Sequence, residues 1–248
     1  PIPLDAFYDR IAAAVTPKTK VILICHMTHW TAQMSPMKRI TEMARQRGID
    51  VIIDGAHGFM HVPDNVRDLG CDYYIASLHK WTMAPPGNGF LYVRKEKIPT
   101  LWPLTPAAEG MKNDIRKFED VGTRTFANRV AIAEGLTFNE GIGIERKSAR
   151  LRYLKERWTN RLKANPKVRF FTSLDPAESC AIATFGIEGT NHAKLGQKLM
   201  DEHGIVVSPM RHAKWEGIRI VPNISMTLQE IDYFADVIEG IIRSGPVT

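Results

Sequence analysis

The chain has 248 residues, of which 44% are hydrophobic and 24% are charged, and its formal net charge is +6. This composition is typical of a globular protein and excludes a disordered, fibrous or membrane-spanning chain, because the apolar runs are too short to cross a bilayer. Basic and acidic residues alternate along the sequence, as in residues 145–152. We therefore expect solvated helix faces, and neither nucleic acid nor membrane as a partner.

The cysteines Cys25, Cys71 and Cys180 each lie in or beside an apolar run. That placement is typical of buried thiols in a reducing compartment, and the spacing fits no zinc site, so we expect no metal. The chain begins without an initiator methionine and without a leader-like segment. From this we expect a cytoplasmic protein of which the chain is a fragment.

The first half of the sequence alternates helix-like and strand-like segments. A helix is expected over residues 4–15, and a second begins with Ser35 as N-cap and Pro36 in the first turn, and ends at Gly48. Short apolar runs predict strands at residues 20–25, 50–53, 72–76 and 89–93. Continuous runs of this kind are typical of strands buried on both faces, so the pattern predicts a covered, mostly parallel sheet.

The second half has a different pattern. Residues 99–120 are expected to be irregular. Helices are expected at residues 126–138, 143–164, 191–203 and 227–242, and strands at 168–171, 181–187, 205–207 and 218–221. Asn191 is a good N-cap and Gly204 a good stop signal, while Thr227 and Glu230 have capping-box spacing. A boundary near residue 140 therefore separates an α/β first part, residues 1–139, from a small α+β part, residues 140–248.

Two polar clusters follow neighbouring expected strands. One is DGAH, beginning at Asp54, and the other is SLHKW, beginning at Ser77. If the strands are parallel neighbours, both clusters lie at the sheet edge where α/β proteins bind ligands. A partly desolvated Asp54 stays ionised only with a cationic partner or several hydrogen bonds, and Lys80 can supply an amine for Schiff-base chemistry. Singly, each residue is an ordinary cap, turn or surface residue, but the combination favours a site.

These motifs carry a family resemblance. DGAH (54–57), SLHKW (77–81) and GFLYVR (89–94) resemble the class V aminotransferases of fold-type I pyridoxal 5′-phosphate (PLP) enzymes, in particular the isopenicillin N epimerase-like members. The similarity continues through HMTHWTAQMSP (26–36), VGTR (121–124) and residues 218–232. It implies an α/β, fold-type I PLP-dependent transferase fold. Residues 1–139 would be the C-terminal portion of the PLP-binding large domain, and residues 140–248 the small domain.

The resemblance implies a role for each residue of the two clusters. Lys80 would hold PLP as a Schiff base and move protons at the substrate α-carbon, and Asp54 would pair with the pyridinium nitrogen. His57 would lie near the phenolic oxygen of the ring. Ser77 and His79 would bind the cofactor phosphate.

Four further residues receive roles in the same way. Thr123 would reach the phosphate of a neighbouring subunit's cofactor, which implies a homodimer. Arg219 would bind the α-carboxylate of a small amino-acid-like substrate through its bidentate guanidinium. His29 would lie near the ring oxygen. Arg124 would either contact a second acidic group of the substrate or pair on the surface.

The resemblance implies an α-carbanion at the substrate but leaves open whether transamination, epimerisation or lyase chemistry follows. Residues 209–217 lack the cysteine that desulfurases of this class carry before the arginine, so persulfide chemistry is not expected. The family's N-terminal phosphate loop and ring-stacking residue have no counterpart in residues 1–20. A catalytically incomplete fragment or a non-catalytic dimerising relative is therefore the alternative. A nucleotide-binding dehydrogenase would need a G-x-G-x-x-G turn, and none is present.

Overall fold

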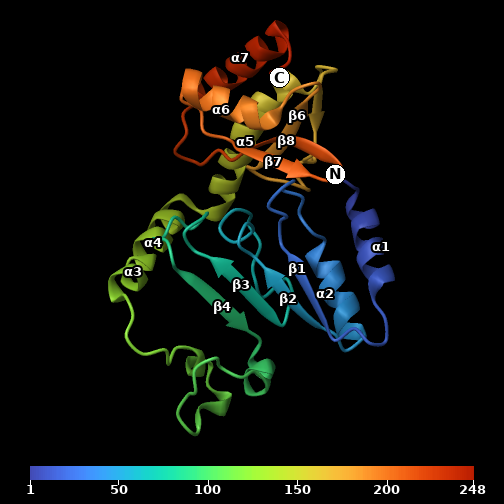
Figure 1. Cartoon of the computed structure of the whole chain (residues 1–248). Coiled ribbons are helices and arrows are strands. Elements are labelled where there is room, and N and C mark those ends of the chain that lie inside the picture. The colour runs from blue at the N-terminus through green and yellow to red at the C-terminus, as the bar shows by residue number, and fades with distance from the viewer. The chain divides into compact units, whose positions relative to one another are not determined.

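The computed structural model describes residues 1–248, which divide into two compact units (Figure 1). The first, called here the N-terminal unit, comprises residues 5–26 and 35–142. The second, the C-terminal unit, comprises residues 1–4, 27–34 and 143–248. None of the helices is both long and apolar enough to span a membrane. The division into domains of residues 1–139 and 140–248 stays a prediction.

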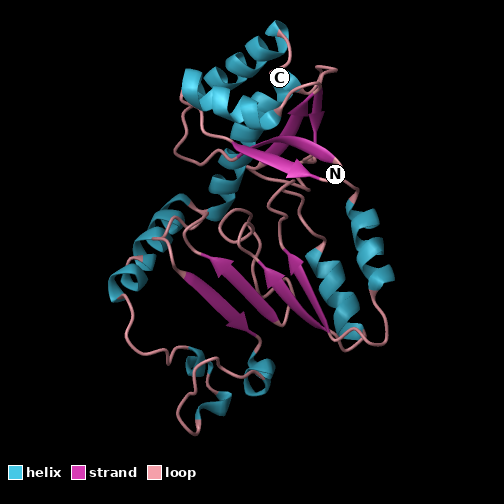
Figure 2. Ribbon diagram, in the orientation of Figure 1, coloured by secondary structure: helices cyan, strands magenta, loops and turns pink.

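A four-stranded sheet of order β1-β2-β3-β4 forms the centre of the N-terminal unit. Strands β1, β2 and β3 are parallel and β4 is antiparallel to β3, which confirms the expected mostly parallel sheet (Figure 2). The elements in chain order are α1 (Leu4–Ala14), β1 (Val21–Cys25), α2 (Met37–Gln46), β2 (Asp50–Asp54), β3 (Tyr73–Ser77) and β4 (Gly89–Val93). Three 3₁₀ helices follow (Lys95–Thr100, Met111–Asn113 and Ile115–Phe118), and then α3 (Phe126–Val130) and α4 (Ile132–Ile142).

One face of β1 is exposed, so the prediction of a strand buried on both faces is wrong for this strand. Ile22 and Ile24 belong to a core that also contains Ile40 of α2, and partly buried residues of α1 pack against it. On the other face, Val21 and Leu23 are 49% and 68% exposed. The apolar run of β1 predicts burial on both faces, but side chains alternate along a strand and only α1 and α2 pack against it.

Two helix predictions also need correction. The N-cap of α2 is Pro36, and Ser35 does not cap the helix. Instead, the Ser35 hydroxyl donates to the Cys25 carbonyl at 2.7 Å, and its N–H donates to the His26 carbonyl. The single helix expected over residues 126–138 is two helices, because Ala131 has a ψ of −8° and interrupts the helical ladder.

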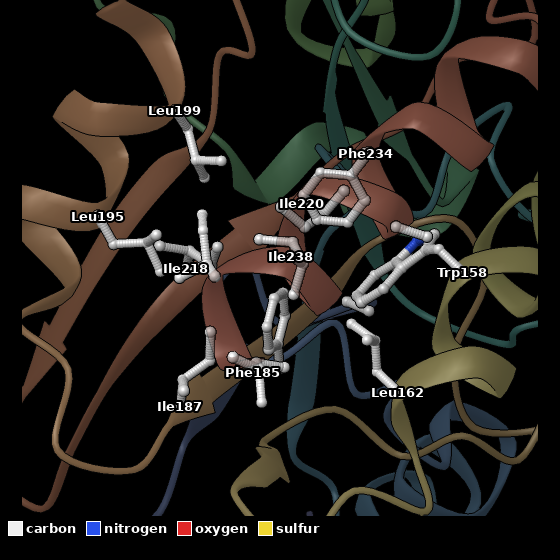
Figure 3. Close-up of a cluster of buried hydrophobic side chains, with 14 of the residues drawn as sticks. Trp158, Leu162, Phe185, Ile187, Leu195, Leu199, Ile218, Ile220, Phe234 and Ile238 are labelled. Atoms are coloured by element: carbon white, nitrogen blue, oxygen red, sulfur yellow. The ribbon is translucent and has the colours of Figure 1, made fainter. Parts of the chain in front are cut away.

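The C-terminal unit is a small α+β structure, as the sequence predicts. Its elements are α5 (Ile144–Leu162), β5 (Val168–Phe170), β6 (Ala183–Ile187), α6 (His192–His203), β7 (Ser208–His212), β8 (Trp215–Ile220) and α7 (Leu228–Ser244). The strands form an antiparallel sheet of order β5-β6-β8-β7. One face of this sheet packs with α5, α6 and α7 around Trp158, Phe185 and Phe234 (Figure 3).

The structure corrects two expectations within this unit. The strand expected at residues 205–207 is absent, and residues 208–220 form the hairpin of β7 and β8. The face of α5 is also less solvated than its charges suggest, because Lys147 and Lys155 are buried. Arg157 forms an ion pair with Asp232 of α7. The Asn191 cap, the Gly204 stop and the Thr227 capping box are present as predicted.

Candidate active site

The two polar clusters lie at the same edge of the first sheet. Asp54 is the last residue of β2 and Ser77 the last residue of β3, and the parallel register pairs Asp54 with Ile75. Because side chains alternate along a strand, Asp54, Ile75 and Ser77 share one face of the sheet. This is the carboxyl edge of the parallel strands, where α/β folds place ligands.

Asp54 is a half-buried carboxylate without a cationic partner. Its Oδ1 accepts a hydrogen bond from the Ala56 N–H at 2.9 Å, and its Oδ2 lies 4.0 Å from the Cys25 sulfur. Desolvation and the Asp54 charge raise the pKa of the Cys25 thiol, so that thiol is protonated near neutral pH. A carboxylate in this position can bind a protonated ring nitrogen, which is the partner that PLP would bring.

Two glycines shape the turn that follows Asp54. A Cβ on Gly55 would come within 2.0 Å of the Tyr74 ring, and a Cβ on Gly58 within 2.2 Å of His26 Nδ1. Tyr74 and His26 are buried and joined by a hydrogen bond of 3.1 Å between Tyr74 Oη and His26 Nδ1. His26 Nε2 in turn lies 2.9 Å from Asp64. The turn is therefore packed closely against a buried polar network.

Lys80 lies on the turn that follows β3, between two anchored neighbours. The side chains of Leu78 and Trp81 are buried, and the Met83 N–H donates to the Lys80 carbonyl at 3.2 Å. This arrangement leaves the Lys80 side chain partly exposed, with its Nζ 3.4 Å from Nε2 of His57. No acidic residue forms an ion pair with Lys80, so its amine is available to a ligand.

His61 and Trp81 support the contact between His57 and Lys80, and His61 lies outside the motifs that predict the site. Their rings stack with centroids 3.6 Å apart and an interplanar angle of 13°. His61 Nδ1 also lies 2.7 Å from the His57 carbonyl oxygen. The contact thus joins the turn bearing His57 to the turn bearing Lys80. The only signal in the sequence is the spacing of His57 and His61, one helical turn apart.

Ser77 and His79 provide polar groups near the same edge. Ser77 is half-buried, His79 is exposed, and neither side chain forms a hydrogen bond within the protein. Both are therefore free to donate to an anion such as a phosphate. Together with the unpaired Asp54 carboxylate and the Lys80 amine, these groups fit the chemistry of PLP.

Thr123 and Arg124 lie in an irregular segment after the last 3₁₀ helix. Thr123 is exposed, and no hydrogen bond or ion pair joins either residue to Asp54 or Lys80. Arg124 is half-buried, and its Nε has no hydrogen-bond partner. Their expected roles toward a neighbouring subunit and the substrate stay predictions.

Arg219 and His29 belong to the C-terminal unit. Arg219 is on β8, and its Nη1 donates to the His29 carbonyl at 2.7 Å. The Nε of Arg219 is buried without a partner, and burial lowers the pKa of the guanidinium. No acidic residue pairs with Arg219, so its remaining donors suit a carboxylate. The structure shows the His29 backbone in contact with Arg219, while the expected role of the His29 ring stays a prediction.

Solved structures show which fold this chain has. The apo cysteine desulfurase of Thermococcus onnurineus NA1 superimposes with a TM-score of 0.82 at 20% identity, covering 98% of this chain and 64% of that one. A C-DES variant with glycine covalently linked to its PLP cofactor also has a TM-score of 0.82, at 21% identity over 93% of this chain and 63% of that one. The fold is therefore that of fold-type I PLP-dependent enzymes, as the sequence predicts.

The family model for class V aminotransferases matches residues 5–233, and the chain belongs to this family. The isopenicillin N epimerase of Streptomyces clavuligerus is 29% identical over 92% of this chain. A probable cysteine desulfurase of Mycolicibacterium paratuberculosis is also 29% identical over 92%. The chain spans 62% of the first relative and 36% of the second. These matches confirm the expected family, which is a family of PLP-dependent enzymes.

Proposed function

We propose that the chain is the part of a PLP-dependent enzyme that holds the cofactor through Lys80 and acts on an amino acid. One observation carries the proposal: Lys80 Nζ lies 3.4 Å from His57 Nε2, at the sheet edge where Asp54 ends the neighbouring strand. The Lys80 amine has no acidic partner, and the Asp54 carboxylate has no cationic one. Each group therefore lacks the kind of partner that PLP provides.

Each residue at this sheet edge has a separate role in the proposal. Bound PLP supplies an electron sink for negative charge at the substrate α-carbon. Asp54 binds the protonated ring nitrogen and thereby holds its proton, because a carboxylate in a partly buried site favours a cation beside it. Ser77 and His79 donate hydrogen bonds to the phosphate. His57 holds the Lys80 amine in place through the 3.4 Å contact, and Lys80 moves the proton at the α-carbon.

The substrate part of the proposal depends on Arg219. Its guanidinium is held by the His29 carbonyl and keeps donors for the α-carboxylate of an amino acid. Arg124, with its buried and unpartnered Nε, is the proposed contact for a second acidic group. Relatives are named for isopenicillin N epimerisation and cysteine desulfuration. Proton movement at the α-carbon is the step that transamination, epimerisation and elimination share, and the proposal is made at that level.

We further propose that the enzyme is a homodimer in which Thr123 reaches the neighbouring subunit's phosphate site. Large apolar side chains are exposed on either side of Thr123 along the chain: Trp102 is 92% exposed and Phe126 67%. Exposed apolar groups of this size favour burial against a partner. The molar mass of the full-length protein, measured by light scattering, tests the dimer.

The same exposed residues favour a second candidate function, a non-catalytic dimerising relative. In that protein the chain would keep the apolar surface of Trp102, Leu104 and Phe126 but would have no need of a free Lys80 amine. The two candidates differ in cofactor binding, because only the enzyme requires PLP on Lys80.

The test is an absorption spectrum of the full-length protein mixed with PLP, before and after Lys80→Ala. We expect a visible band of lysine-bound PLP that is absent in Lys80→Ala, and borohydride reduction followed by mass spectrometry should locate the cofactor on Lys80. Lys95→Ala, at a lysine on the first 3₁₀ helix, is the matched control and should keep the band. An unchanged band in Lys80→Ala would refute the enzyme proposal, and no band in the wild type would favour the non-catalytic relative.

A further inference from the structure

The second sheet has two chemically different faces. Phe185 of β6 and Ile218 of β8 belong to the helix-covered core. Because side chains alternate along a strand, Trp215 and Arg219 of β8 lie on the opposite face. The register pairs His212 of β7 with Trp215, which places His212 on that face as well. Arg219, His212 and Trp215 therefore share the face of the sheet that lies opposite the helix-covered core.

The segment of residues 27–34 packs on this face. Arg219 Nη1 donates to the His29 carbonyl at 2.7 Å, and the hydroxyl of Thr184 donates to the Trp30 carbonyl. Thr184 is paired with Arg219 in the sheet, so both contacts come from neighbouring positions on the same face. They fix His29 and Trp30 beside Arg219.

Trp30 then completes a cluster of aromatic rings. Its ring lies edge-on to His212 at 5.6 Å and to Trp215 at 6.1 Å between centroids. His212 and Trp215 stack at 5.6 Å, and Phe171 stacks behind Trp215 at 4.4 Å. Phe171 is buried, whereas Trp30, His212 and Trp215 remain partly or fully exposed. The outer three rings thus present aromatic surface that a ligand can contact.

The segment of residues 27–34 contacts both the guanidinium and the rings. His29 contacts Arg219 through its carbonyl, and the next residue, Trp30, contacts both His212 and Trp215. Trp215 and Arg219 are four residues apart on β8, about 13 Å along the strand. Trp30 bridges that distance, because its carbonyl accepts from Thr184, the sheet neighbour of Arg219, and its ring packs on Trp215.

We propose that this face selects the side chain of the substrate, and that the substrate is an amino acid with an aromatic side chain. The α-carboxylate binds Arg219, and the aromatic group packs on Trp30, His212 and Trp215. Ring pairs prefer offset or edge-on contacts, and the perpendicular arrangement of Trp30 and Trp215, at 88°, offers both a ring face and a ring edge. This inference rests on the proposed function, since it takes Arg219 as the carboxylate site.

The test uses amine-free probes, so that binding is measured without turnover. The dissociation constants of 3-phenylpropionate and propionate are measured by calorimetry on the full-length protein with PLP. We expect the wild type to prefer the aromatic probe, and Trp215→Ala to reduce that preference by about 2- to 10-fold, the range for one aromatic contact. Trp215→Phe should retain most of it. Tyr233→Ala, at an exposed aromatic residue of α7, which covers the opposite face of the sheet, should not change it.

Two results would overturn the inference. One is equal affinity of the wild type for the two probes, which needs no variant and so does not depend on whether Trp215→Ala folds. The other is an equal loss for both probes in Trp215→Ala, which would mean that Trp215 only supports Arg219. In either case a retained band of lysine-bound PLP would show that the proposed function stands while the specificity does not. Absence of the band in the wild type would instead show that the proposed function fails, and the inference with it, whatever the probe preference.

Discussion

Two glycines set the spacing around His57 at the candidate active site. Gly55 and Gly58 bracket the turn, and each lies where a Cβ would overlap a buried side chain, the Tyr74 ring and the His26 ring respectively. Tyr74 and His26 are bonded to each other, so neither can move without breaking a buried hydrogen bond. The position of His57 relative to Lys80 therefore requires that Gly55 and Gly58 have no side chain.

Gly55→Ala is expected to destabilise the protein and weaken PLP binding together. Overpacking a buried site costs about 1–3 kcal/mol, and here the contact is 2.0 Å from a ring with no free space to enter. Gly240→Ala, in the middle of α7 with only the end of Arg243 nearby, is the control, and it should stabilise by up to about 1 kcal/mol. Urea unfolding and PLP titration measure both effects. Equal stability of the two variants would contradict the close packing.

The sequence predicts the positions of some residues at the candidate site but not of others. Asp54 and Lys80 can be placed from the chain because each follows an apolar strand, and parallel strands bring their ends to one edge. His26, Tyr74 and His61 cannot be placed in this way. The hydrogen bond from His26 to Tyr74 joins residues 48 apart in the sequence, and the ring stacking of His61 depends on the path of a loop. Contacts of this kind leave no periodic signal.

At the scale of an element, helix α7 begins with the capping box that the sequence predicts. The Thr227 hydroxyl accepts from the Glu230 N–H at 3.2 Å, and the Glu230 carboxylate accepts from the Thr227 N–H at 2.7 Å. The Glu230 carboxylate accepts a further hydrogen bond from the Thr227 hydroxyl at 2.9 Å, and the two bonds that it accepts lower its pKa. Because the folded-state pKa is lowered, the bonds of the Glu230 carboxylate stabilise the fold at pH values above the ordinary pKa of a carboxyl group. This stabilisation is lost as the pH falls through the lowered folded-state pKa.

Thr227→Ala is expected to reduce the unfolding free energy by about 1 kcal/mol, the usual cost of losing an N-cap, whereas Thr227→Ser should retain most of the stability. Thr125→Ala is the matched control, because Thr125 is the N-cap of α3 but makes no side-chain capping bond. Urea unfolding near neutral pH measures the three variants. Similar losses for Thr227→Ala and Thr125→Ala would show that the capping bonds contribute nothing.

Strand β7, an edge strand of the second sheet, is the strand that the sequence does not predict. Strand β7 has the sequence SPMRH, with a proline and two basic residues, and no apolar run. It can still pair because it is the edge strand of its sheet, where a proline without an N–H need not complete a ladder on its outer side. The apolar residues 205–207 look more like a strand in isolation, but the ladder with β8 begins at Ser208, which pairs with Arg219. Which residues form this strand is therefore decided by their register with β8, and register is a non-local property.

On the scale of the whole molecule, buried ionisable groups make stability depend on pH in two opposing ways. Burial lowers the pKa of Lys147 from 10.5 to about 8, and raises the pKa values of Cys71 and Cys180 from 9.0 to about 11. Between about pH 8 and 10.5 the unfolded lysine holds a proton that the folded one has released, so stability rises with pH. Above about pH 9 the unfolded thiols ionise while the folded ones do not, so their contribution falls.

Comparison of Lys147→Met with the wild type reports mainly on the lysine, because Lys147 is not among the groups that shift the pKa of Cys71 and is the smallest of those that shift the pKa of Cys180. Near pH 7 the variant should be the more stable, since the folded wild type must keep a charged ammonium in a site that is only 1% exposed. As the pH rises above about 8, the difference should shrink by up to about 1.4 kcal/mol per pH unit, because the folded wild-type lysine becomes neutral. Urea unfolding of both proteins at about pH 7 and about pH 10 measures this change. Lys163→Met, at an exposed lysine just after α5, should show no such pH dependence. A difference that stays constant with pH would mean that Lys147 titrates alike in the folded and unfolded chains, and that its burial carries no electrostatic cost.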